Sequence, residues 1–249
     1  MTSSSIAYLD HVAASTPGRD YKGRALAALD LVPGNMVLDL GCGPGTDLAG
    51  LVAGVGPTGG VIGVDADPEM LATARLRVPV ATFHLGDAHA LPLADASVDR
   101  ARADRVLQHV ADPARAVAEL RRVLRPGGRV VLADNDWDTL VVDDPDLETS
   151  RAYTRYVSDA RVRNATVGRQ LARLCAAAGF VVTDVEAVTI VFRDLSVAER
   201  ILRIGDVTGW AVRDGAIDAD RARAWLARVT AGPFLASSTV FVTTATVPD

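Results

Sequence analysis

Short apolar runs alternate with stretches of helical spacing through the first part of the chain. Residues 37–40 and 61–65 are brief and largely apolar, as buried strands are. Between them, Leu48, Leu51 and Val55 recur at spacings of three and four residues, which predicts a helix with one core-facing side. A strand, a helix and a strand within about 30 residues form a βαβ unit, whose crossover makes the strands parallel. This pattern predicts an α/β fold.

The same alternation continues to the end of the chain. Further strands are predicted over 81–87, 97–105, 129–134, 181–192 and 238–244. Further helices are predicted over 24–31, from Pro68 onward, and over 113–124, 168–178, 197–212 and 219–229. The fourth strand is unusually charged for a buried position. Together these elements predict a doubly wound, Rossmann-like sheet of seven strands.

The first strand ends in three glycines at alternate positions, Gly41, Gly43 and Gly45, so the backbone can turn tightly and approach a ligand closely. A pyrophosphate-binding loop would place its third glycine where Thr46 stands. The carboxylate of Asp39 would also repel a pyrophosphate. The loop therefore favours a cationic or hydroxyl-bearing ligand, and the alternative is a glycine-rich turn that binds nothing.

A second acidic residue, Asp65, closes the second strand. A carboxylate at this place in a doubly wound sheet accepts hydrogen bonds from ribose hydroxyls. The alternative is that Asp65 only caps the helix that begins at Pro68, although Asp67 already supplies a cap there. With Asp39, this acid indicates recognition of a nucleoside without a pyrophosphate.

The pattern Asp39-x-Gly41-x-Gly43-x-Gly45 resembles motif I of the class I S-adenosylmethionine-dependent methyltransferases. Residues 107–128 also resemble the corresponding stretch of the small-molecule branch of that family, which contains the ubiquinone- and menaquinone-biosynthesis enzymes (the methyltransferase type 11 domain). The resemblance implies S-adenosylmethionine as the cofactor, S-adenosylhomocysteine as its product, and a mostly parallel sheet with an antiparallel last strand.

The resemblance also assigns cofactor contacts residue by residue. Asp87, at the end of the third strand, would receive the adenine amino group, and the N–H of Ala88 would reach a ring nitrogen. Met70 packs either on the adenine or in the ordinary core. The full set implied for the cofactor is Asp39, Gly41, Cys42, Gly43, Gly45, Thr46, Asp65, Ala66, Met70, Gly86, Asp87, Ala88 and Arg105.

A single domain is expected over 1–249, because no clean linker divides the chain. By resemblance, residues 1–35 form an N-terminal helical lid and residues 36–134 form the cofactor-binding core. Cap insertions are expected over 135–165 and 195–232. The candidate lid contacts, for which ordinary packing is the alternative, are Tyr8, His11, Tyr21 and Arg24.

The implied reaction moves a sulfonium methyl group to an oxygen, nitrogen or carbon atom of a small-molecule acceptor, in a biosynthetic or tailoring step. His109 is the first candidate for a general base, because imidazole titrates near neutral pH and the residue follows the fourth strand. The alternative is that His109 only shapes the pocket. Asp134 is the second candidate, followed by Asp136 and His11.

The acceptor site is less defined by the sequence. Trp137, Tyr153 and Arg161 are expected to line it, because they lie in the stretch after the fifth strand. A rival hypothesis is a protein that keeps this fold and cofactor but does not transfer methyl, for example one that assists a cyclisation or rearrangement. Motif I does not separate the two.

The composition limits the expected partners and the expected cellular compartment. The chain has 249 residues, of which 49% are hydrophobic, and a net charge of −5, so there is no basic footprint for nucleic acid. Two cysteines make neither a disulfide framework nor a metal cluster, and they favour a reduced, cytoplasmic setting. No leader is recognised, and no apolar run approaches the roughly 20 residues that span a bilayer. A homodimer is left open.

Overall fold

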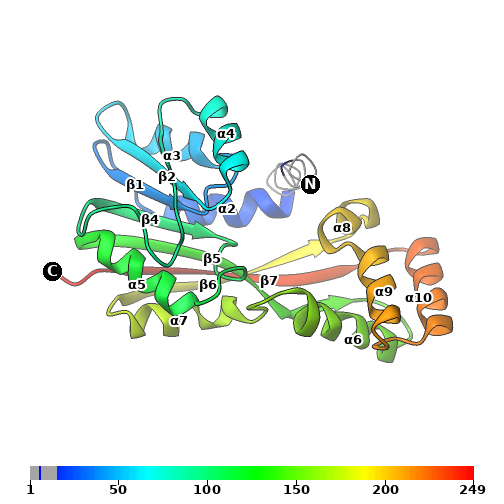
Figure 1. The fold of residues 1–249 in the computed structure, drawn as a ribbon. Coiled ribbons are helices and arrows are strands. Elements are labelled where there is room, and N and C mark those ends of the chain that lie inside the picture. Colours follow the sequence, from blue (N-terminus) through cyan, green and yellow to red (C-terminus); the bar gives the residue numbers. More distant parts are fainter. Residues whose placement is uncertain (1–5, 7–15) are drawn as a thin grey trace.

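A computed structural model describes Ile6 and residues 16–249. Its strands are β1 (Met36–Leu40), β2 (Gly60–Asp65), β3 (Thr82–Leu85), β4 (Val98–Asp104), β5 (Leu124–Val142), β6 (Val181–Phe192) and β7 (Ala236–Thr246). They form one seven-stranded sheet in the order β3-β2-β1-β4-β5-β7-β6 (Figure 1). The first five strands pair in parallel, and β7 runs antiparallel to both β5 and β6. The predicted doubly wound sheet with an antiparallel last strand is confirmed.

Helices cover both faces of this sheet. They are α2 (Thr16–Ala28), α3 (Leu48–Val55), α4 (Pro68–Arg77), α5 (Pro113–Val123), α6 (Leu147–Tyr156), the π-helix η1 (Val157–Arg161), α7 (Val167–Ala177), α8 (Leu195–Leu202), α9 (Ile204–Arg213) and α10 (Ala219–Ala231). In Figure 1, α2, α3 and α4 lie on one face, and α5 and α7 lie on the other. Two clusters of buried side chains fill the spaces beneath them, one for each face. None of the described helices is both long and apolar enough to cross a membrane.

The fifth strand is much longer than its apolar pattern predicts. The expected end at Asp134 is wrong, because β5 continues through 135–142 and pairs there with β7. Three polar residues in the middle of this strand hide its continuation in the sequence. Asp134, Asn135 and Asp136 are all buried, and the carboxylates of Asp134 and Asp136 find polar partners in distant segments of the folded chain.

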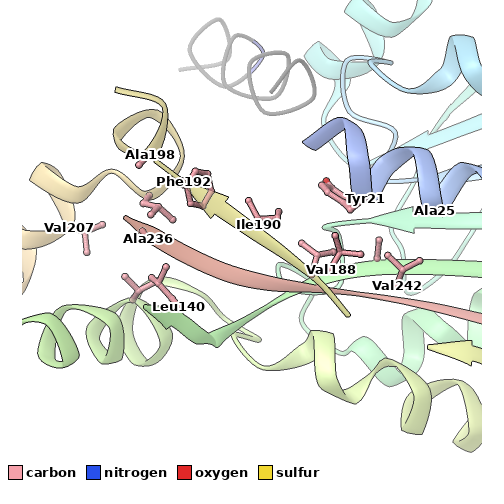
Figure 2. Close-up of a cluster of buried hydrophobic side chains, with 14 of the residues drawn as sticks. Tyr21, Ala25, Leu140, Val188, Ile190, Phe192, Ala198, Val207, Ala236 and Val242 are labelled. Carbon is pink, nitrogen blue, oxygen red and sulfur yellow. The ribbon is translucent and has the colours of Figure 1, made fainter. Parts of the chain in front are cut away.

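The prolonged β5, β6 and β7 carry a second group of helices, α6 and α8 to α10, at the far end of the sheet (Figure 1). Leu140, Ile190, Phe192, Val207 and Ala236 belong there to one buried cluster, which continues along the strands to Tyr21 of α2, beside Val188 and Val242 (Figure 2). Burial of these apolar side chains is the main favourable term for attaching the helices. The far helices are therefore continuous with one face of the central core.

Several element boundaries differ from the sequence pattern. The predicted helix over 197–212 is two helices, α8 and α9, because Arg203 between them adopts a left-handed conformation with φ of +51°. In β3, the expected apolar alternation is only partial, since Leu85 is 59% exposed. Two candidate lid residues, Tyr8 and His11, lie outside the described residues.

Candidate active site

The glycine loop joins β1 to α3 at the edge of the sheet where the parallel strands end. Gly41, Gly43 and Gly45 all have positive φ, the conformation that glycine adopts at little cost. At Gly41 space is also short, because an added Cβ would lie 2.3 Å from a methyl carbon of Val106. An added Cβ at Gly45 would press on Ala74 of α4 at 3.2 Å. The predicted tight turn is therefore required both by backbone conformation and by close packing.

Asp65 ties the end of β2 to this loop. One carboxylate oxygen accepts a hydrogen bond from the N–H of Gly43 at 2.8 Å, and the other accepts one from the N–H of Asp67 at 2.9 Å. Asp67, and not Asp65, caps α4, since its carboxylate accepts from Glu69 and Met70. The alternative in which Asp65 is only a helix cap is therefore wrong, and its carboxylate is held beside the backbone of the glycine loop.

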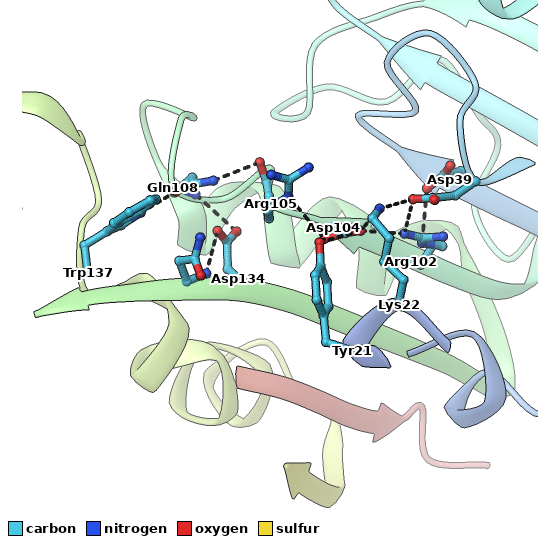
Figure 3. A network of polar contacts seen from close by, with 11 residues as sticks. Tyr21, Lys22, Asp39, Arg102, Asp104, Arg105, Gln108, Asp134 and Trp137 are labelled. Carbon is cyan, nitrogen blue, oxygen red and sulfur yellow. Dashed lines mark hydrogen bonds and ion pairs between the residues drawn. The ribbon is translucent and has the colours of Figure 1, made fainter. Parts of the chain in front are cut away.

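A cluster of buried charges lies next to the loop (Figure 3). Lys22 of α2 forms ion pairs with Asp47 and, at 2.5 Å, with Asp104. Arg102 of β4 reaches the same two carboxylates at 3.1 and 3.0 Å, and Asp39 at 3.4 Å. These five side chains line one pocket together with the backbone of the glycine loop.

Burial and charge act in opposite directions within this cluster. Burial raises the pKa of Asp39 to about 6, although Arg102 opposes the shift. Burial acts in the same sense on Asp104, but Lys22 and Arg102 outweigh it and hold the pKa of this carboxyl below its usual range. Of the two carboxyl groups, Asp104 is therefore more firmly ionised at neutral pH than Asp39.

Six of the residues assigned to the cofactor line this pocket: Asp39, Gly41, Cys42, Gly43, Thr46 and Arg105. Cys42 is buried, and burial raises the pKa of its thiol. The thiol is therefore uncharged and packs as a small apolar side chain. Arg105 has φ of +56°, an uncommon conformation for a residue with a side chain. Its N–H donates to the carbonyl of Ala133 at 2.7 Å, which anchors the strained backbone to β5.

The remaining assigned residues lie after β2 and β3. Met70 and Ala88 are buried, whereas Ala66 and Asp87 are exposed, and Gly86 lies between β3 and Asp87. The carboxylate of Asp87 accepts from the N–H of His89 at 2.9 Å and contacts its ring at 2.5 Å. The hydrogen bond from the His89 backbone lowers the pKa of Asp87. An ionised carboxylate is therefore present where adenine recognition is expected.

A second pocket adjoins the first. Arg105 lines both pockets, and Tyr21 of the second pocket donates its hydroxyl hydrogen to Asp104 of the first at 3.1 Å. The full lining of the second pocket is Gly18, Tyr21, Arg105, Gln108, Asn135, Trp137, Ile190, Phe192, Ile201, Leu202 and Ser238. Most of this wall is apolar, and it comes from α2, β5, β6, β7, α8 and the segment after β4.

Polar side chains of the second pocket belong to a network of hydrogen bonds (Figure 3). The indole N–H of Trp137 donates to the side-chain oxygen of Gln108 at 2.7 Å. The backbone N–H of Gln108 donates to Asp134 at 3.3 Å. Burial raises the pKa of Asp134 to about 8. This carboxyl is therefore largely protonated at neutral pH and lies directly behind a wall residue of the pocket.

The other catalytic and acceptor candidates lie elsewhere. His109 is exposed and is not part of either pocket wall, and lost solvation together with the charge of Arg105 lowers its pKa. Tyr153 is fully buried against Trp225, with ring centres 4.9 Å apart. Arg161 lies over the ring of Trp210 at 4.0 Å. Of the three residues expected to line the acceptor site, the pocket wall contains only Trp137.

Asp136, a further candidate for the base, is fully buried and forms an ion pair with Arg169 of α7. Arg24 of the predicted lid is half exposed and reaches Glu186 at 3.2 Å on the surface, whereas Tyr21 of the same helix lines a pocket.

Sequence reasoning did not assign Lys22, Asp47, Arg102 or Asp104 to the site. The unusual charge of the fourth strand was a signal for Arg102 and Asp104, whereas no sequence pattern marked Lys22 or Asp47.

Comparison with known proteins gives the family context. A family model described as a methyltransferase domain matches residues 38–132. The chain is 53% identical over 243 residues to an uncharacterized 37.1 kDa protein in transposon TN4556 of Streptomyces fradiae, covering 96% of this chain and 70% of that protein. It is 37% identical over 117 residues to a demethylmenaquinone methyltransferase of Renibacterium salmoninarum, covering 47% of this chain and 48% of that enzyme. The chain thus spans about half the length of the latter relative.

Among solved structures, the YcgJ protein of Bacillus subtilis is similar, with a TM-score of 0.67 and 21% sequence identity. The match covers 93% of this chain and 99% of that protein. At this identity the likeness concerns the fold. It extends well beyond the residues of the family model, into the long strands and their helices.

Proposed function

Because the chain belongs to the class I S-adenosylmethionine-dependent methyltransferases, we propose that it methylates a small-molecule acceptor in a biosynthetic or tailoring reaction. The observation that carries this proposal is the pairing of two adjoining pockets, one charged and one mainly apolar. Arg105 lines both. A cofactor in the first pocket and an acceptor in the second would therefore meet beside this residue.

The charged pocket suits the amino-acid end of the cofactor, which carries an ammonium and a carboxylate. Asp39, Asp47 and Asp104 are the carboxylates available to the ammonium, while Lys22 and Arg102 are the cations available to the carboxylate. Charge-assisted hydrogen bonds of this kind are roughly twice as strong as neutral ones. The donor set therefore fits a zwitterionic group better than a phosphate.

The nucleoside end is supported by two further acids. Each carboxylate oxygen of Asp65 accepts one backbone N–H and still has a lone pair for a ribose hydroxyl. Asp87 is exposed at the end of β3 and is expected to receive the adenine amino group, with the N–H of Ala88 beside it. Met70, on the first turn of α4, is the expected packing surface for the ring.

When bound, S-adenosylmethionine supplies a methyl group on a positively charged sulfur. The protein aligns the acceptor and excludes water, and well-oriented reactants reach effective molarities of about 10⁵–10⁸ M. Tyr21 and Arg105 stand between the two pockets and are placed to orient the acceptor.

A general base is required only if the acceptor loses a proton. Of the two candidates, Asp134 is favoured over His109, because its carboxylate contacts the backbone of the pocket residue Gln108. Burial raises the pKa of Asp134 to about 8, so its ionised fraction, and with it any action as a base, would increase as pH rises through about 8. Neither His109 nor Asp134 lines a pocket wall, so Asp134 is preferred only for its contact with Gln108, and His109 is the alternative.

Calorimetric titration with S-adenosylhomocysteine tests the proposal. The wild-type protein is expected to bind in the micromolar range. Asp65→Ala is expected to bind about tenfold to a hundredfold more weakly, because hydrogen bonds to a charged group contribute about 1.5–3 kcal/mol. Asp143→Ala, which removes an exposed acid just after β5, is the matched control and should bind as the wild type does. Absence of binding to the wild type, or unchanged binding by Asp65→Ala, contradicts the proposal.

A further inference from the structure

The side chains of the second, mainly apolar pocket indicate which kind of acceptor would fit, which family membership alone does not. Its body is formed by Trp137 of β5, Ile190 and Phe192 of β6, and Ile201 and Leu202 of α8. Ile190, Phe192 and Leu202 are each less than one-tenth exposed, so they are held firmly by the core behind them. A wall of aromatic and branched side chains favours an apolar ligand body.

One polar group of the pocket has no hydrogen-bond partner in the part of the chain that the structure describes. Asn135 is 7% exposed, and its side-chain oxygen Oδ1 is buried with no hydrogen-bond partner among the described residues. A buried acceptor left unsatisfied is costly, and buried polar groups in folded proteins are almost always paired. A ligand that donates a hydrogen bond to Asn135 Oδ1 would remove this cost.

The charges around the pocket are compensated within the protein. Arg105 faces Asp104 at 3.8 Å. Asp134, behind Gln108, is largely protonated at neutral pH because burial raises its pKa to about 8. The indole N–H of Trp137 is already engaged by Gln108. The part of the wall that the structure describes therefore favours a neutral ligand over an ion.

From these observations we propose that the acceptor is a neutral, largely apolar molecule whose hydroxyl or N–H group donates a hydrogen bond to Asn135 Oδ1. The proposal rests on the proposed function, since it takes the apolar pocket as the acceptor site. Asn135 would act as a specificity-determining residue. It fixes which end of the acceptor faces Arg105 and the neighbouring charged pocket.

The test uses indole and 1-methylindole as probes, without cofactor. Both probes are neutral and apolar, and neither carries a strong hydrogen-bond acceptor. They differ in that only indole has an N–H that can donate a hydrogen bond. Ligand-observed NMR titration of the wild-type protein should show indole binding about tenfold more tightly, the effect expected of one hydrogen bond to a buried carbonyl. Asn135→Leu should bind both probes and lose this preference.

Gln170→Leu is the matched control, because it removes a half-buried amide on α7 that is not part of the pocket wall. It should keep the tenfold preference. Circular dichroism checks that each variant is folded, and Asn135→Ala replaces Asn135→Leu if the latter does not fold. Equal affinity of the wild type for the two probes, binding of neither, or an unchanged preference in the folded Asn135 variant overturns the proposal.

The calorimetric titration with S-adenosylhomocysteine is run on the same preparations. Loss of cofactor binding with the indole preference intact would count against the proposed function and leave the pocket chemistry standing. Normal cofactor binding with no indole preference would overturn only the inference about the acceptor. The two failures are therefore distinguishable.

Discussion

Several residues of the site are both charged and deeply buried. Arg102 and Asp39 are each 4% exposed and lie 3.4 Å apart. A buried charge is costly unless it is paired and hydrogen-bonded. Three carboxylates around Arg102 and Lys22 meet that requirement, and they also give the cofactor pocket its mixed charge. Asp134 differs, because its burial outweighs the charge of Arg105 and raises the pKa of this carboxyl.

Asp134 makes the stability of the protein depend on pH in a defined direction. An unfolded aspartate has a pKa near 4, whereas burial raises the folded value to about 8. Between these values the folded protein binds more protons than the unfolded chain. The contribution to stability is therefore complete below the unfolded pKa and is lost as pH rises through about 8.

We expect Asp134→Asn to remove this dependence. Denaturant unfolding of the wild type between pH 6.5 and 8 should show stability falling by up to about 1.4 kcal/mol per pH unit. The lower limit lies above the raised pKa of Asp39, which is about 6, and so reduces the contribution of that titration. Asp143→Asn, at an exposed position, should behave as the wild type does. A wild-type profile that stays flat or rises over this range would contradict the assignment.

At the scale of elements, the long strands are the feature that separates this chain from a minimal doubly wound sheet. β5, β6 and β7 extend past the edge where β1 to β4 end and carry α6 and α8 to α10 (Figure 1). Two of the strands, β5 and β6, supply apolar walls of the second pocket. The extension therefore builds the proposed acceptor site, and the strand ends of β1, β2 and β4 build the cofactor site.

Leu140 and Val141 of β5 provide a matched test of this extension. Leu140 is 3% exposed in the cluster of Figure 2, whereas Val141 points outward and is 52% exposed. Leu140→Ala should lower the free energy of unfolding by about 2–5 kcal/mol through lost burial and a cavity. Val141→Ala should change it little. Equal effects in urea unfolding would mean that the extension is not packed as part of the core.

At the scale of the whole molecule, α2 joins the two sites. Tyr21 lines the apolar pocket, and the next residue, Lys22, lines the charged one. Their partner Asp104 lies at the end of β4, and Lys22 also pairs with Asp47 at the start of α3. The described part of the N-terminal segment is thus held over the sheet by ion pairs and by burial of Tyr21. Residues of α2 line both pockets, and the role of residues 1–35 as a lid stays a prediction.

Lys22→Met should weaken this closure and the cofactor site together. We expect S-adenosylhomocysteine to bind about tenfold more weakly, because one charge-assisted contact is lost and two carboxylates remain undercompensated. Arg24→Met, in the same helix but half exposed, is the control and should bind normally. Calorimetry measures both. A Lys22→Met variant with wild-type affinity would show that the cation serves only to attach α2.

The sequence alone determined the order of the elements, the glycine loop and the strand-end acids Asp39, Asp65 and Asp87. These follow from local rules: apolar spacing, the conformational freedom of glycine and the place of a carboxylate at a strand end. The family was recognisable from the same residues. Helix starts at Pro68 and Pro113 were also predictable, because the cap and the first-turn proline lie side by side in the chain.

Only the tertiary structure decided the charge cluster, the acceptor pocket and the length of β5. Lys22 and Asp104 are 82 residues apart, so no local pattern pairs them. The predicted strand ended at Asp134 because a run of polar residues begins there, and the partners of Asp134 and Asp136 lie in distant segments. The pocket wall is likewise gathered from strands and helices that meet only when the sheet forms. Contacts between distant segments determine these features, and for that reason they stay hidden until the chain is folded.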